Sequence, residues 1–252
     1  MRVLGSALFW IYCGTSLAVW WVAVVIPWLL ITPFDRRRRF AHWYAYTWAN
    51  HFHAISPYWK IRLRGEDKVD PNCAYVMTAN HESSADILLI YRLKKQYRWV
   101  SKKTNFLTPF LGWMMWMAGY VGVERGLRKS REKMLDDCKR QLDMGNSIMI
   151  FPEGTRSDDD DLLPFKRGAF YIACQNRVPV LPIVIAGSRE ILPRGSLVFA
   201  VTGRMPAYID VLDPVDPAEV DYNAKALSKL VQQRMREHRD GLRDELAGNP
   251  PV

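Results

Sequence analysis

This 252-residue chain lacks several motifs that mark common enzyme classes. It has no glycine-rich phosphate loop of the GxxxxGK or GxGxxG type, so neither kind of nucleotide site is indicated. The histidines of HFH, residues 51–53, have no third ligand at a suitable spacing. The cysteines form no CxxC pair, which argues against a zinc or redox centre and favours reduced thiols: Cys13, Cys73, Cys138 and Cys174. We therefore expect no metal and no cofactor.

Charged residues are missing from Val3 to Phe34. About 20 apolar residues suffice to cross a bilayer, and this stretch is too long for a typical signal-peptide core. Four arginines follow at 36–39, which by the positive-inside rule places this end in the cytoplasm. We expect an inner (cytoplasmic) membrane location with the rest of the chain on the cytoplasmic face. Pro27 and Pro33 allow a second possibility, a helix that stops near Val25 followed by chain running along the headgroups.

The next stretch, FAHWYAYTWANHFHAISPYW (residues 40–59), has aromatic residues at roughly helical spacing beside the arginine cluster. This pattern favours an interfacial helix, although an ordinary amphipathic helix packed on the domain would have the same spacing. The sequence thus predicts a membrane anchor and interfacial helix over residues 1–57. A second domain is expected over residues 58–252.

A formal net charge of +9 indicates an anionic partner. Nucleic acid, a membrane surface and phosphorylated or carrier-bound substrates all fit such a charge. The apolar anchor and the lack of a nucleic-acid motif argue against nucleic acid. Membrane lipids and a phosphorylated or carrier-bound substrate remain.

After residue 58, short apolar runs alternate with helical segments. This alternation predicts an α/β fold with a mostly parallel central sheet flanked by helices, joined to the N-terminal membrane-associated helical element. Strands are expected at 74–79, 97–101, 120–124, 147–151, 178–186, 197–201 and 207–212. Helices are expected at 85–93, 108–119, 128–144, 165–175 and 222–246.

The stretch NHESSAD (residues 80–86) follows a predicted buried strand. Five residues of helix rotate too far for His81 and Asp86 to share a helical face, so we expect the histidine in the loop and the aspartate in the first helical turn. The carboxylate can then accept from Nδ1 and leave Nε2 as a general base. A capping role without chemistry is the alternative. No glycine lies near Ser83 or Ser84 to build a nucleophile elbow.

Basic groups follow three predicted strands. FPEGTRS (residues 151–157) offers a turn at Gly154, a guanidinium at Arg156 that can bind phosphate, and Glu153, which can hold Arg156 or a substrate hydroxyl. Arg125 closes GYVGVER, and Lys102 with Lys103 closes another strand. Convergence of these strand ends beside His81 would suit an anionic substrate.

In this order, NHESSAD, GYVGVER, FPEGTRS and the apolar VPVLPIVI resemble the four blocks of the glycerolipid acyltransferase family, over roughly residues 60–190. The resemblance implies that His81, oriented by Asp86, acts as general base on the sn-2 hydroxyl of lysophosphatidic acid. The hydroxyl would attack the thioester of acyl-carrier protein or acyl-CoA without an acyl-enzyme, giving phosphatidic acid.

The resemblance also implies roles for other residues. Arg125 and Arg156 would hold the glycerol phosphate and Lys102 would contact it, with Glu153, Gly154 and Thr155 shaping the pocket. Pro179 and Pro182 would border the acyl or thioester side. Separately, the chemistry needs donors to the oxyanion, which we expect to be backbone amides at the helix start after His81, with no individual amide singled out. Other lysolipid acceptors, such as a different lysophospholipid or a lyso-ornithine lipid, stay open, as does a non-catalytic protein that binds anionic lipid.

Overall fold

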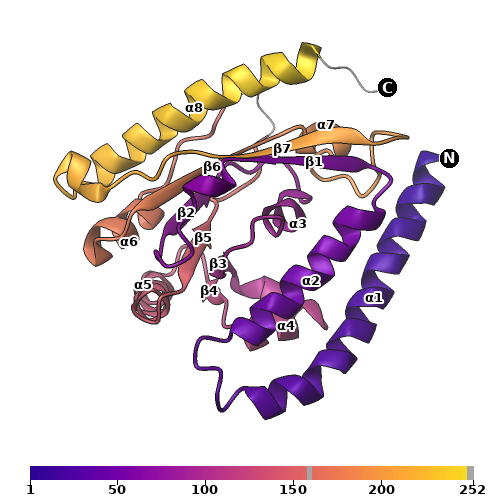
Figure 1. Cartoon of the computed structure of the whole chain (residues 1–252), viewed down its shortest axis with the longest axis horizontal. Helices are drawn as coiled ribbons and strands as arrows, with labels where there is room; N and C mark the ends of the chain where they lie inside the picture. The colour runs from indigo at the N-terminus through magenta and orange to yellow at the C-terminus, as the bar shows by residue number, and fades with distance from the viewer. Residues whose placement is uncertain (158–160, 249–252) are drawn as a thin grey trace.

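The computed structural model describes residues 1–157 and 161–248 and has a central sheet between layers of helices (Figure 1). The strands are β1 (Trp59–Arg64), β2 (Val76–Ala79), β3 (Tyr97–Lys102), β4 (Val121–Val123), β5 (Ser147–Ile150), β6 (Val180–Ala186) and β7 (Met205–Val211). The helices are α1 (Arg2–Ile31), α2 (Arg39–Ile55), α3 (Asp86–Ile90), α4 (Leu111–Met117), α5 (Arg128–Asp143), α6 (Gly168–Asn176), α7 (Ser188–Ile191) and α8 (Ala224–Gly248).

The seven strands lie in the order β1-β7-β6-β2-β5-β3-β4. Every neighbouring pair is parallel except β6 and β7, so the predicted mostly parallel sheet is confirmed. The carboxyl ends of β2, β3, β4 and β5 consequently meet at one edge, and this is the edge where ligand sites of open α/β sheets form.

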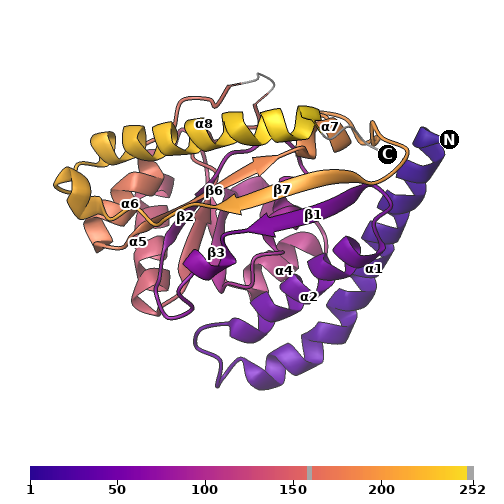
Figure 2. The same cartoon turned by 45° about the horizontal axis from the view of Figure 1, so that its top comes forward.

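The central strands are apolar on both faces because helices cover both sides of the sheet. Val76 and Ile148 contribute to a core cluster with α5, α6 and α8, whereas their neighbours Met77 and Met149 contribute to a cluster with α1, α2 and α3. Figure 2 shows α8 on one side of the sheet and the pair α1 and α2 on the other. Two cores therefore share one sheet.

Two parts of the sheet differ from expectation. The segment 197–201 is irregular and not a strand, so that prediction is wrong. Its apolar character has another cause, because Phe199 packs 3.8 Å from Tyr58 and 5.0 Å from Phe9, measured between ring centroids. The sequence reasoning also missed β1, whose alternation of Trp59 and Leu63 with basic residues is a strand pattern.

α1 runs through Pro27 to Ile31, so it does not stop near Val25. By length and composition it is apolar enough to cross a membrane, and only 6% of its most apolar window is buried in the protein. Both of its ends nevertheless contact the rest of the chain. Phe9 packs on Phe199, and Trp28 lies 5.5 Å from Trp116 of α4.

α2 returns alongside α1 in the opposite direction (Figures 1 and 2). It packs against the domain through Ala41, His42, Ala49 and Phe52, while Trp43 stays 53% exposed. Burial and the nearby Arg98 guanidinium lower the pKa of His42 to about 3, so this ring is neutral in the core. The aromatic spacing of residues 40–59 thus belongs to a helix with one face in the core and another exposed.

Candidate active site

A histidine–aspartate pair lies at the carboxyl end of β2. His81 belongs to the loop after β2, and Asp86 is the first residue of α3. Nδ1 of His81 lies 2.8 Å from Oδ2 of Asp86, whose side chain is fully buried. Because a carboxylate accepts this bond, the ring proton sits on Nδ1 and Nε2 is free to take another. The predicted placement of both residues is confirmed.

The same Asp86 oxygen organises the loop. Oδ2 also accepts the backbone N–H groups of Glu82 at 2.8 Å and Ser83 at 2.9 Å. Three N–H donors to one carboxylate oxygen fold the loop so that His81 faces Asp86. These two amides are therefore occupied, and the expectation that an amide at the helix start stabilises the oxyanion stays a prediction for the amides that follow them.

Glu153 holds the backbone of His81. Its Oε1 accepts the N–H of His81 at 2.8 Å and its Oε2 accepts the N–H of Leu163 at 3.0 Å. The N–H of Ser157 donates to the His81 carbonyl at 2.8 Å, so FPEGTRS is bonded to NHESSAD on both sides of the histidine. Glu153 is buried, and this burial raises the pKa of its carboxyl. Within the described residues it forms no bond to Arg156 and does not line the cavity, contrary to expectation.

Two positions that the sequence reasoning left without a role complete the support. The Asn80 side chain exchanges hydrogen bonds with the backbone of Ile185, both at 2.8 Å, and ties the loop to β6. The Phe151 ring stacks on the His81 imidazole with centroids 4.0 Å apart and planes at 8°. The sequence features that could have indicated these supporting roles are the asparagine directly before His81 and the aromatic residue directly after β5.

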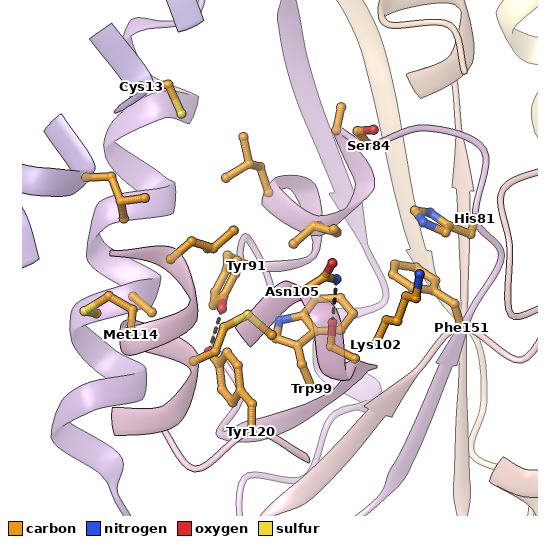
Figure 3. A pocket seen from close by; sticks show the side chains of 18 of the residues that line it. Cys13, His81, Ser84, Tyr91, Trp99, Lys102, Asn105, Met114, Tyr120 and Phe151 are labelled. Carbon is orange, nitrogen blue, oxygen red and sulfur yellow. Dashed lines mark hydrogen bonds between the residues drawn. The ribbon is translucent and has the colours of Figure 1, made fainter. Parts of the chain in front are cut away.

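The imidazole opens on a cavity of about 510 Å³ (Figure 3). Its interior is apolar and is built largely by α1, α2, α3 and α4, with Leu17, Trp21, Trp48, Leu88, Met114 and Met115 in the wall. Figure 3 shows His81, Phe151 and Lys102 at one side and Met114 and Cys13 at the other. A reacting group at His81 would thus have a long apolar space beside it.

Cations border the same cavity near His81. Lys102, Arg125 and Arg156 line it together with Gly154 and Thr155, so the three strand ends converge as the sequence indicated. Lys103 does not join them and instead lies 3.6 Å from Glu124. The cavity therefore combines a histidine–aspartate pair, a basic rim and an apolar interior.

Neither serine of NHESSAD hydrogen-bonds His81 within the described part of the chain. The Ser83 hydroxyl is buried and donates to the Leu192 carbonyl at 2.7 Å, while Ser84 Oγ accepts from the Arg156 guanidinium. The two serines support the loop and the rim, as expected from the absence of a nucleophile elbow.

Glu82, next to the histidine, points away from the cavity into a basic cluster. Its Oε1 lies 3.7 Å from Arg189 and 3.6 Å from Arg243 of α8. Burial, followed by the Asp86 carboxylate, raises the pKa of Glu82 to about 7. This cluster joins the loop to the C-terminal helix.

The HFH histidines of α2 are used for packing. His51 bonds the Tyr12 hydroxyl, and burial lowers the pKa of His53 to about 4. Across residues 1–157 and 161–248, no three His, Cys, Asp or Glu side chains cluster in a way that could hold a metal ion.

A family model described as Acyltransferase matches residues 60–186. The chloroplastic 1-acyl-sn-glycerol-3-phosphate acyltransferase of Brassica napus is 38% identical over 192 residues, covering 75% of this chain and 55% of the relative. The chloroplastic enzyme of the same name from Arabidopsis thaliana is 36% identical over 190 residues, covering 75% and 53%. The chain thus spans about half the length of these curated relatives.

Among solved structures, the chain is similar to the 1-acyl-sn-glycerophosphate (LPA) acyltransferase PlsC from Thermotoga maritima. The TM-score is 0.77 at 25% sequence identity, with 96% of this chain and 98% of the other covered. The similarity therefore includes the two N-terminal helices as well as the sheet.

Proposed function

The chain belongs to the acyltransferase family, and from that premise we propose that it transfers an acyl chain to the sn-2 hydroxyl of 1-acylglycerol 3-phosphate (lysophosphatidic acid). The product is phosphatidic acid, and the donor is a thioester of acyl-carrier protein or coenzyme A. The observation that carries this proposal is one cavity in which the His81–Asp86 pair, a basic rim and an apolar interior adjoin.

The chemistry requires one base and an activated acyl group. Nε2 of His81 takes the proton from the sn-2 hydroxyl as its oxygen attacks the thioester carbonyl carbon. An ester C–O bond forms, the C–S bond breaks, and the proton passes from Nε2 to the leaving sulfur. Asp86 stabilises the imidazolium in between. No acyl-enzyme forms, because the acceptor hydroxyl attacks the thioester directly.

The basic rim explains why the acceptor carries a phosphate. The phosphate of lysophosphatidic acid is only a few covalent bonds from the reacting hydroxyl, so it must bind in the cavity that contains His81. Arg125 and Arg156 bind it and Lys102 adds a third positive charge, while Gly154 and Thr155 shape the turn beside it.

The apolar interior receives an acyl chain and limits its length. Met114 and Met115 of α4 line this space together with Leu17 and Trp21 of α1, so α1 closes the cavity that the sheet domain leaves open. Pro182 belongs to the buried strand β6 and Pro179 directly precedes it, and neither lines the cavity, so both shape it indirectly.

The helices α1 and α2 attach the protein to the cytoplasmic face of a membrane. Because both ends of α1 pack on the domain, α1 lies in one leaflet with its exposed face in lipid, and does not project across the bilayer. Exposed apolar side chains continue this face from α1 to α4, including Leu8, Ile11, Val22, Leu29, Phe34, Trp113 and Trp116. Residues 36–39 are basic and suit anionic headgroups.

A panel of acceptors with one acyl donor tests this function. Lysophosphatidic acid should be the best substrate, and monoacylglycerol, which lacks the phosphate, should react far more slowly. Arg156→Ala should lower kcat/KM for lysophosphatidic acid by about 10–100-fold, the value of one lost charge-assisted contact, and leave monoacylglycerol unchanged. Lys103→Ala, which removes a cation outside the cavity, is the control. Equal rates with both acceptors in the unsubstituted protein would contradict the phosphate role.

A further inference from the structure

A second groove of about 300 Å³ adjoins the cavity on the side of α5 and α6. It shares Lys102, Arg125 and Gly154 with the cavity but is not lined by His81. Two cations belong to it alone, Arg131 of α5 and Lys166, just before α6. We call this space the basic groove, defined by Lys102, Arg125, Arg131 and Lys166.

Lys166 is held at the junction of the two spaces. Its backbone N–H donates to the Pro152 carbonyl at 2.9 Å, which fixes it beside the FPEGTRS turn. Its side chain lies across Gly154, where φ is +71° and an added Cβ would come within 2.4 Å of the Lys166 Nζ. Glycine at position 154 therefore allows the turn and also leaves room for the Lys166 ammonium group.

The basic groove carries excess positive charge. Among the described residues that line it, Glu124 is the one acidic side chain, and its carboxylate lies 3.6 Å from Lys103, which does not line the groove. Within the described residues, the side chains of Arg131 and Lys166 form no ion pair or hydrogen bond. Gathering like charges without counter-charges is unfavourable, and a bound anion would remove that cost.

The proposed acyl transfer involves two phosphates, and this inference rests on that function. The acceptor phosphate is tied closely to the reacting hydroxyl and must stay in the cavity with His81. The donor phosphate is separated from the thioester by the whole pantetheine arm, so it reaches beyond that cavity. We propose that the basic groove binds the phosphopantetheine arm of the donor, with Lys166 and Arg131 contacting its phosphate.

The rest of the groove matches the arm. Leu127, Met134 and Val123 give it an apolar wall for the gem-dimethyl carbons next to the phosphate. Leu127 is 52% exposed, so apolar surface is available there for a ligand. Acyl-CoA and acyl-carrier protein share this arm, so the groove serves either donor by the same contacts.

Donor truncation tests the proposal. With acyl-phosphopantetheine as donor, Lys166→Ala and Arg131→Ala should each lower kcat/KM about tenfold. Acyl-pantetheine lacks the phosphate, so with this donor both variants should have the same kcat/KM as the unsubstituted protein. The KM for lysophosphatidic acid should not change. Arg167→Ala and Arg128→Ala are controls, because each removes a neighbouring exposed arginine that does not line the groove.

Three outcomes would overturn the assignment. Equal losses of kcat/KM with acyl-phosphopantetheine and acyl-pantetheine would show that the two cations do not bind the donor phosphate. A raised KM for lysophosphatidic acid would show that the basic groove binds the acceptor. A loss with acyl-CoA but not with acyl-carrier protein would show that it binds the nucleotide of coenzyme A.

Calorimetric binding of phosphopantetheine separates this inference from the proposed function. Suppose that the unsubstituted protein does not acylate lysophosphatidic acid but binds phosphopantetheine about tenfold more tightly than Lys166→Ala. This result would contradict the proposed function and support phosphopantetheine binding by the basic groove. Acylation of lysophosphatidic acid together with equal phosphopantetheine binding by the unsubstituted protein and Lys166→Ala would support the function and contradict the inference about the groove.

Discussion

Replacing Asp86 by asparagine should separate catalysis from folding. All three donors to this side chain, the His81 ring and the amides of Glu82 and Ser83, use the same oxygen, Oδ2. Oδ1 is buried and has no hydrogen-bond partner within the described residues. An asparagine can therefore keep its carbonyl oxygen at the Oδ2 position and turn its amide nitrogen to the vacant side.

The substitution leaves the geometry intact but removes the negative charge. The bonds change from charge-assisted to neutral, which should cost less than about 3 kcal/mol of stability. The imidazolium formed during the reaction loses its counter-charge, so kcat should fall by about 10²–10⁴-fold, the usual contribution of a positioned base. That loss corresponds to about 3–5 kcal/mol of transition-state stabilisation.

The assay is the initial rate of acyl transfer by purified protein in detergent, with thermal unfolding recorded on the same sample. Asp136→Asn makes the same chemical change on an exposed position of α5 and should leave both readings unchanged. A folded Asp86→Asn protein with an undiminished kcat would refute the role of Asp86 in orienting and charging His81.

Three further predictions concern the surroundings of the pair. Glu153→Gln should destabilise the fold by about 1–3 kcal/mol and reduce activity, because an amide cannot accept from both His81 and Leu163; chemical denaturation with parallel rate measurements checks this. The pKa of Glu82 is raised from 4.5 to about 7 in the folded protein, so the folded state binds this proton more tightly and stability should fall as pH rises between these values. Melting curves from pH 4 to 8 should show this fall, and Glu82→Gln should make it smaller. Met114→Trp should shorten the longest acyl chain accepted, measured as rates over donors of graded length relative to the shortest, and an unchanged profile would contradict the chain-binding role of the cavity.

The sequence was sufficient where a local pattern decides the structure. The pair His81 and Asp86 could be placed on either side of a helix start because helical geometry forbids their sharing a face. The alternation of apolar runs and helices likewise determined the parallel sheet, and the strand ends carrying Lys102, Arg125 and Arg156 meet as parallel topology requires.

The sequence was insufficient where contacts between distant segments decide. Glu153 looked free to bind a ligand, yet its oxygens are taken by amides 72 and 10 positions away in the chain. The run around Phe199 is apolar because it packs on α1 and not because it forms a strand. Lys166 carries no motif, and its place over Gly154 follows only from the folded turn.

The most direct measurement is the product formed from lysophosphatidic acid and an acyl thioester by the purified protein and by its His81→Ala variant, identified by mass. The unsubstituted protein should release phosphatidic acid carrying both acyl chains, with one free thiol per product, and the variant should be folded and inactive. A variant that still forms phosphatidic acid at the original rate would contradict the assignment of His81 as the base.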